Sequence, residues 1–158
     1  MMTGILLLSF LLTGCGSPEP QTGKKMSMYY INTAETKVEV HEQYLNTKTL
    51  DEQLDETMRY LSTTPEKLEY KAPLDMGFRV LDYEVEDGKL LINVDKAYSE
   101  LSPTTEVLVR AAIVRTLTQL PNVKYVGITV EDSQLYDNAG EMVGWMNADQ
   151  FINNDCLL

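Results

Sequence analysis

Hydrophobic residues recur along the chain from Met26 onward in patterns typical of short strands alternating with helices. Residues 28–31 and 37–45 are rich in β-branched and aromatic residues, which predicts two strands. A β-hairpin is predicted over residues 78–94, because the Asp-Gly pair at its centre supplies the positive φ angles of a type I′ turn. Residues 123–130 carry apolar residues on one face and predict a further strand.

Two longer helices are predicted between these strands. The first begins at Thr49, whose spacing to Glu52 is that of a capping box, and ends near Ser62. The second begins after Ser102, with Pro103 at its first position. Each helix has one apolar face, formed in the first by Leu50, Leu54, Met58 and Leu61 and in the second by Val109, Ala112, Ile113, Thr116, Leu117 and Leu120.

The order of these elements predicts the class of fold. A last short helix begins at Asn147, where Gln150 completes a reciprocal cap. The pattern βαββαβ, with an additional strand near the start, predicts an α+β fold of two layers, in which two main helices pack on one face of a mixed β-sheet. We expect this single domain to cover residues 26–155.

The first 14 residues have the features of a secretory signal. They carry no charged side chain, and their apolar run over residues 5–12 is too short to cross a hydrocarbon core of about 30 Å. A run of this length is typical of the apolar part of a signal peptide. The run ends in the order of a bacterial lipobox, which is an apolar residue, two small residues and a cysteine: Leu12, Thr13, Gly14 and Cys15.

This lipobox predicts that Cys15 becomes the new N-terminus and carries a diacylglyceryl group on its thiol. Two acyl chains anchor a protein stably, whereas a single chain binds marginally. Residues 15–25 are rich in Gly, Pro and polar residues, which predicts a flexible linker. We therefore expect a domain held by its lipid at the extracytoplasmic face of the cell membrane. The other cysteine, Cys156, is expected to be an unpaired thiol near the C-terminus.

Composition disfavours several classes of partner and site. A net charge of −11 repels phosphate backbones, so nucleic acid is not expected as a partner. The single histidine, His41, has no cysteine or second histidine at ligand spacing, so neither a metal site nor a cofactor is predicted. Serine nucleophiles lack a Gly-x-Ser-x-Gly elbow, and His41 has no identifiable triad partner, so we do not expect an enzyme.

The predicted joint between the second helix and the next strand resembles a known family. Residues 114–126 read VRTLTQLPNVKYV, close to the "TLT-apolar-P-x-V-x-x-V" joint of the GerM-type domain (GerMN), which was first named for sporulation and spore-germination proteins. The hairpin over residues 80–94, Pro73 before it and the Asp95–Tyr98 exit after it are similar as well. The resemblance covers roughly residues 28–152. It implies a fold akin to ring-building motifs, present here in one copy where the sporulation protein carries two.

The resemblance also carries the expected function. It implies an envelope lipoprotein of a Gram-positive bacterium that acts as a non-enzymatic interaction or assembly module, linked to sporulation or germination, with another envelope protein or itself as partner. Tyr and Trp are enriched at binding hot spots, so Trp145, Tyr29 and Tyr30 are the candidate interaction surface. Two alternatives are a cell-wall- or small-ligand-binding lipoprotein, which predicts a concave pocket, and an envelope hydrolase, which predicts clustered acids in a groove.

Overall fold

The computed structural model describes residues 23–64 and 69–151. The predicted signal peptide, the lipobox residues Leu12, Thr13, Gly14 and Cys15, most of the predicted linker, and Cys156 lie outside the described residues. The first described strand begins at Lys24, two residues before the predicted start of the domain. Lys24 donates a hydrogen bond to the carbonyl oxygen of Gln119 at 3.1 Å, so the end of the predicted linker belongs to the fold.

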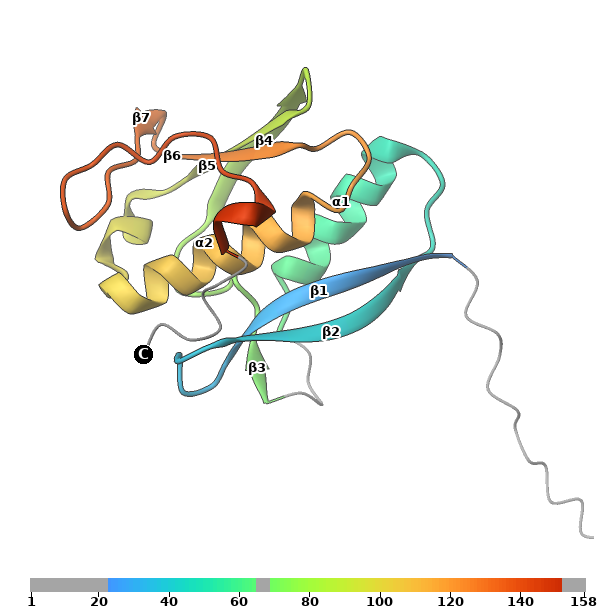
Figure 1. The fold of residues 1–158 in the computed structure, drawn as a ribbon, viewed down its shortest axis with the longest axis horizontal. Helices are drawn as coiled ribbons and strands as arrows, with labels where there is room; N and C mark the ends of the chain where they lie inside the picture. Colours follow the sequence, from blue (N-terminus) through green and yellow to red (C-terminus); the bar gives the residue numbers. More distant parts are fainter. Residues whose placement is uncertain (1–22, 65–68, 152–158) are drawn as a thin grey trace, which may run out of the picture.

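The described strands form two separate sheets (Figure 1). The first sheet has the order β2-β1-β3 and is antiparallel throughout: β1 (Lys24–Asn32), β2 (Val38–Leu45) and β3 (Tyr70–Lys71). The second has the order β4-β5-β6-β7 and is mixed, because β5 and β6 run parallel while the other neighbours are antiparallel: β4 (Val80–Glu86), β5 (Lys89–Val94), β6 (Tyr125–Val130) and β7 (Ser133–Gln134).

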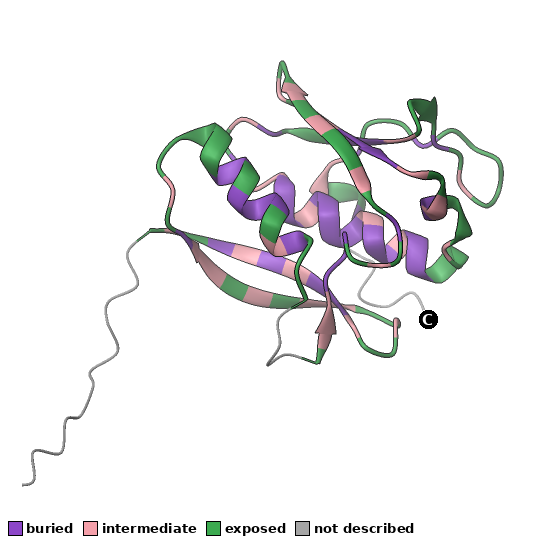
Figure 2. Cartoon of the chain, turned by 180° about the vertical axis from the view of Figure 1, so that it is seen from behind, coloured by how far each residue is buried: buried purple, intermediate pink, exposed green. Residues whose placement is uncertain are grey.

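Both long helices lie between the two sheets (Figures 1 and 2). They are α1 (Leu50–Leu61) and α2 (Pro103–Leu117), and two short 3₁₀ helices, η1 (Lys96–Glu100) and η2 (Ala148–Phe151), complete the described elements. The helix α2 contacts β1 of the first sheet and β6 of the second. Ten of its 15 residues are buried, because a helix covered by a sheet on each side needs apolar residues around most of its circumference.

The α+β class is confirmed, and the arrangement of its layers differs from the expectation. A single sheet with both helices on one face would leave one side of α2 in solvent. Instead, Leu108 and Ala111 are buried as well as the predicted face of that helix. This burial agrees with the strand order, in which the strands form two sheets and the helices form the layer between them.

Local signals in the sequence are confirmed at the ends of the elements. Thr49 and Glu52 form the predicted capping box of α1, and the Ser102 side chain caps α2. The hairpin between β4 and β5 turns through two residues with positive φ, Asp87 at 50° and Gly88 at 81°. In the described part of the chain, no helix is both long and apolar enough to cross a membrane.

Candidate interaction surface

The outer face of the second sheet carries three rows of paired residues. In β5, the residues Leu90, Ile92 and Val94 are buried against the helices, so the alternate residues point to the opposite face. The pairing of β4 with β5 and of β5 with β6 then fixes the rows: Glu86–Lys89–Tyr125, Glu84–Leu91–Gly127 and Asp82–Asn93–Thr129.

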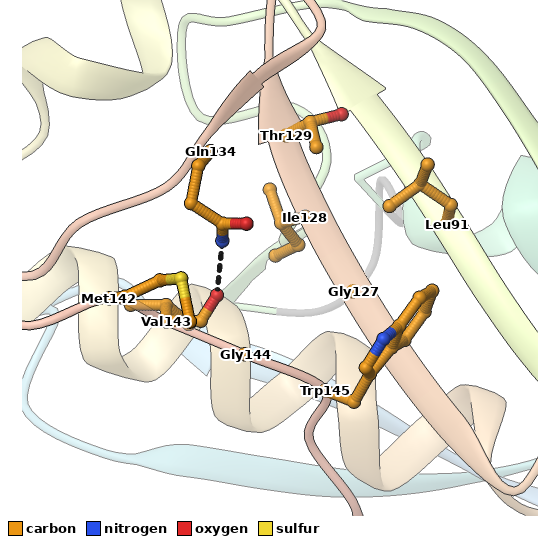
Figure 3. A pocket seen from close by; sticks show the side chains of 9 residues that line it. All are labelled: Leu91, Gly127, Ile128, Thr129, Gln134, Met142, Val143, Gly144 and Trp145. Atoms are coloured by element: carbon orange, nitrogen blue, oxygen red, sulfur yellow. Dashed lines mark hydrogen bonds between the residues drawn. The ribbon is translucent and has the colours of Figure 1, made fainter.

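The segment that follows β7 returns along β6 and places Trp145 on this same face. Val126 and Met146 exchange two backbone hydrogen bonds of 2.8 Å each, so residues 143–146 run beside the edge of β6. Val143 and Met146 are buried, and the indole of Trp145 between them lies over β6 beside Gly127 (Figure 3). We call the three rows, together with Met142 and Trp145, the tryptophan face.

Hydrogen bonds fix the path of the loop that runs from β7 to Trp145. The Asp137 carboxylate accepts from the backbone N–H groups of Ala139 and Glu141, both at 2.9 Å. The Gln134 side chain donates to the carbonyl oxygen of Val143 at 2.7 Å (Figure 3). Because these bonds fix the backbone on both sides of residue 142, the loop presents its apolar side chains in one place.

A small cavity opens between the loop and the sheet. Its volume is about 170 Å³, and it is lined by Leu91, Gly127, Ile128, Thr129, Gln134, Met142, Val143, Gly144 and Trp145 (Figure 3). Met142 is 62% exposed and Trp145 is 43% exposed, although both are large apolar side chains. The Nζ of Lys89 lies 5.4 Å from the centre of the Trp145 ring, a distance at which a cation is attracted by the aromatic face.

Carboxylates of β4 line one side of the apolar centre formed by Leu91, Met142 and Trp145. Asp82, Glu84 and Glu86 are exposed on the outward positions of this strand. The buried amide of Asn93 donates to Asp82 at 3.0 Å and to Asp132 at 2.7 Å, and so holds two carboxylates close to one another. Lys89 is the one basic residue among the nine positions of the three rows, so the tryptophan face has an acidic margin.

The inner side of β4 is held against the helices by a second set of polar contacts. The Tyr83 hydroxyl donates to the Asp55 carboxylate of α1 at 2.8 Å. Burial, and then this hydrogen bond, raise the pKa of Tyr83 to about 12. At the end of β5, the hydrogen bond from the Arg79 side chain lowers the pKa of Asp95 below its usual value. Both contacts hold the strands that carry the tryptophan face.

The three predicted surface residues do not come together. Trp145 lies on the second sheet, whereas Tyr29 and Tyr30 lie in β1 of the first. Tyr29 is half-buried beneath the guanidinium of Arg115, which is 4.3 Å from its ring centre. Tyr30 is 2% exposed and stacks on Tyr70, so its assignment to a surface is wrong: alternation along β1 turns it into the core.

Several residues of the tryptophan face were not identified from the sequence. Leu91 and Gly127 become partners of Trp145 only through the fold. A glycine inside a strand often marks a close approach of another group, and this signal at Gly127 could have indicated the site. Among the residues that the structure describes, no three His, Cys, Asp or Glu side chains lie in a group able to hold a metal ion.

Comparison with known proteins agrees with this architecture. The first GerMN domain of the sporulation protein GerM from Bacillus subtilis is 14% identical, with a TM-score of 0.61 over 80% of this chain and 98% of that chain. The tandem GerMN domains of the same protein are 18% identical, with a TM-score of 0.56 over 85% of this chain and 49% of that one. A candidate lipoprotein from Clostridium perfringens is 17% identical, with a TM-score of 0.53 over 80% of this chain and 89% of that one.

These likenesses show a shared fold. A search of curated proteins finds no match to the chain. The model of one family, Germane, described as "Sporulation and spore germination", matches residues 27–136, which is more than half of the chain. This stretch runs from within β1 to just after β7 and includes both long helices. The chain therefore belongs to the Germane family of sporulation and spore-germination domains.

Proposed function

We propose that this protein is an exported lipoprotein whose domain serves as a non-enzymatic protein-interaction module at the outer face of the cytoplasmic membrane, in sporulation or germination. The observation that carries the interaction is the tryptophan face. Exposed aromatic and apolar side chains grouped around one cavity, with a polar margin, are typical of a protein-binding surface. The lipobox supports the anchor, and the structural likeness to a candidate lipoprotein is consistent with it.

The anchor is tested by comparing the two cysteines of the chain. Cells are fed an alkyne-tagged palmitate, and the full chain is purified as wild type, Cys15→Ser and Cys156→Ser. We expect label and membrane association in the wild type and in Cys156→Ser, and loss of both in Cys15→Ser. An uncleaved leader, or a bare thiol at Cys15 in mass spectrometry of the native protein, would contradict the anchor.

The interaction is tested with a photo-crosslinking amino acid placed at one exposed apolar position at a time. Met142 lies on the tryptophan face, and Val40, which is 54% exposed, lies on the first sheet and serves as the control. In sporulating cells, we expect a discrete adduct with an envelope protein from position 142 and not from position 40. Adducts of equal yield from both positions would argue against a specific surface.

The two alternative functions receive less support from the geometry. The cavity beside Trp145, of about 170 Å³, is smaller than the roughly 300–1,000 Å³ of ordinary ligand pockets. A larger hollow of about 470 Å³, lined by residues that include Pro121, Lys124 and Asn147, is a shallow, open surface and not an enclosed pocket. Asp82 and Asp132 are clustered as a hydrolase would need, but both are exposed on the surface of the sheet, whereas a catalytic acid is placed in a desolvated groove. Turnover of peptidoglycan fragments by the purified protein would overturn the non-enzymatic assignment.

A further inference from the structure

The charge and shape of the tryptophan face indicate the chemistry of its partner. We propose that it binds a basic segment of an envelope protein in which one bulky aliphatic side chain is flanked by lysine or arginine residues. The aliphatic side chain would enter the cavity beside Trp145, and the flanking cations would lie against the carboxylates of β4. This inference rests on the proposed interaction function and specifies its partner.

The cavity sets the size of the apolar group. Its volume of about 170 Å³ suits one aliphatic side chain. Its walls are the apolar side chains of Leu91, Met142 and Trp145, and the backbone at Gly127, against which the Trp145 ring lies. Large apolar side chains left exposed in a group on a folded domain mark a binding surface more often than a solvated one.

The carboxylates at the margin of the tryptophan face determine the charge expected for the groups that flank the partner's aliphatic side chain. Glu84 pairs with Leu91 across the two strands, so a carboxylate stands directly beside the apolar centre. Glu86 and Asp82 lie one row to either side, spaced along β4 as alternate residues. Residues in an extended partner segment repeat at the same spacing, so cations on both sides of an aliphatic residue would each meet a carboxylate.

The protein itself shows that the indole accepts an amine. Lys89 holds its Nζ 5.4 Å from the centre of the Trp145 ring, so the indole already has its own cation, and the cations of a partner would lie against the carboxylates of β4 instead. A second copy of this chain fits less well, because two chains with a net charge of −11 each repel one another. Charge complementarity therefore favours a basic partner over self-association.

The test uses Trp145 as its own reporter, since it is the sole tryptophan of the chain. The full chain is held in vesicles of zwitterionic lipid, and the probe is the peptide acetyl-Lys-Lys-Leu-Lys-Lys-amide. We expect a saturable change in tryptophan emission that weakens as salt is raised, as for charge-assisted binding. Two matched peptides, one with serine in place of the leucine and one with glutamate in place of the lysines, are expected to bind at least about tenfold more weakly.

Two charge reversals locate the binding. Glu84→Lys should weaken the peptide about tenfold, because it replaces an attraction at the cavity by a repulsion. Glu100→Lys makes the same change in net charge on η1 and should leave the affinity within twofold. Met142→Ser, at a side chain that is 62% exposed, should weaken the leucine peptide and leave the serine peptide unchanged.

The opposite results would overturn the inference. Equal binding of the leucine and serine peptides, equal losses in Glu84→Lys and Glu100→Lys, or an absence of any emission change would each exclude the proposed partner chemistry. Sedimentation velocity that showed a dimer lost on Met142→Ser would assign the face to a second copy. A failed titration with a retained crosslink at Met142 would leave the interaction module intact with a partner of other chemistry, so the two proposals fail separately.

Discussion

The indole ring of Trp145 lies against the space that a side chain at Gly127 would fill. A Cβ built on Gly127 would stand 2.8 Å from Cζ3 and 3.0 Å from Cε3 of the ring, and 3.2 Å from Cδ1 of Leu91. Contacts of this length between carbon atoms are repulsive, since their optimum is about 3.5–4.0 Å. The glycine and the tryptophan, which are far apart in sequence, therefore depend on one another.

Replacing Gly127 by alanine is expected to displace the tryptophan. The added methyl group must push aside the ring or the Leu91 side chain, and overpacking of this kind costs about 1–3 kcal/mol. Urea unfolding should show a lower midpoint, and the emission of Trp145 should shift in the folded protein. The control is Gly144→Ala, because a Cβ there meets nothing within 4 Å and the residue is adjacent to the same tryptophan. Equal effects of the two changes would contradict this account of the face.

Local features of the fold could be predicted from the sequence, whereas contacts between separate segments could not. The capping box at Thr49, the hairpin turn at Asp87 and the helix start at Ser102 were predicted correctly, because each depends on residues close in sequence. Periodicity does not say which strands share a sheet, so the division into two sheets was not predicted. Gly127 inside a predicted strand could indicate a close approach of another group, but the identity of that group, Trp145, follows from the fold alone.

The burial of polar residues in α2 could not be predicted from the sequence for the same reason. A helix with a single apolar face would leave Glu106 and Arg110 in solvent. In the structure Glu106 is buried, and it accepts hydrogen bonds from the Tyr98 hydroxyl at 3.0 Å and from Arg110 at 2.8 Å. Glu106 and Arg110 therefore neutralise each other inside the middle layer, where the two sheets cover most of α2.

The buried carboxylate of Glu56 is expected to hold β2 to α1. It is 6% exposed and accepts hydrogen bonds from the backbone N–H of Asn46 at 3.0 Å and from the hydroxyl of Thr47 at 2.7 Å. Glu56→Ala leaves these donors without their acceptor, which costs about 1–3 kcal/mol in the free energy of unfolding. Asp51→Ala, on the exposed side of the same helix, is the control and should cost about 0.5 kcal/mol or less. Chemical denaturation compares them, and similar losses would contradict the assignment.

The contact between Tyr83 and Asp55 is expected to appear in an alkaline titration. Folding raises the pKa of Tyr83 to about 12 by burial and by the hydrogen bond to Asp55. A tyrosine whose folded pKa is raised stabilises the fold below its ordinary value of 10, and this contribution is lost as the pH rises above 10. In Asp55→Asn, Tyr83 should ionise at lower pH, measured by absorbance at 295 nm, with Tyr83→Phe identifying its signal. An unchanged titration in Asp55→Asn would show that burial alone sets the shift.

The carboxylate of Glu35 is expected to make part of the stability depend on acid pH. Glu35 lies in the turn between β1 and β2, and it accepts hydrogen bonds from the Lys71 ammonium and, at 2.6 Å, from the Thr105 hydroxyl. These bonds, first that from Lys71 and then that from Thr105, lower the pKa of Glu35. The turn is thereby tied to β3 and to the first turn of α2, which joins the first sheet to the middle layer.

The sign of the effect follows from the lowered pKa. A carboxylate with a depressed folded pKa stabilises the fold above its ordinary value of 4.5, and the contribution is lost as the pH falls through the folded pKa. Glu35→Gln should therefore cost about 0.5–1 kcal/mol at pH 7, because the pair with Lys71 is part-exposed, and the difference from the wild type should shrink below pH 4. Unfolding midpoints measured from pH 7 to pH 3 test this, with the exposed Glu100→Gln as control. A difference that stays constant over this range would show that Glu35 acts through its shape and not its charge.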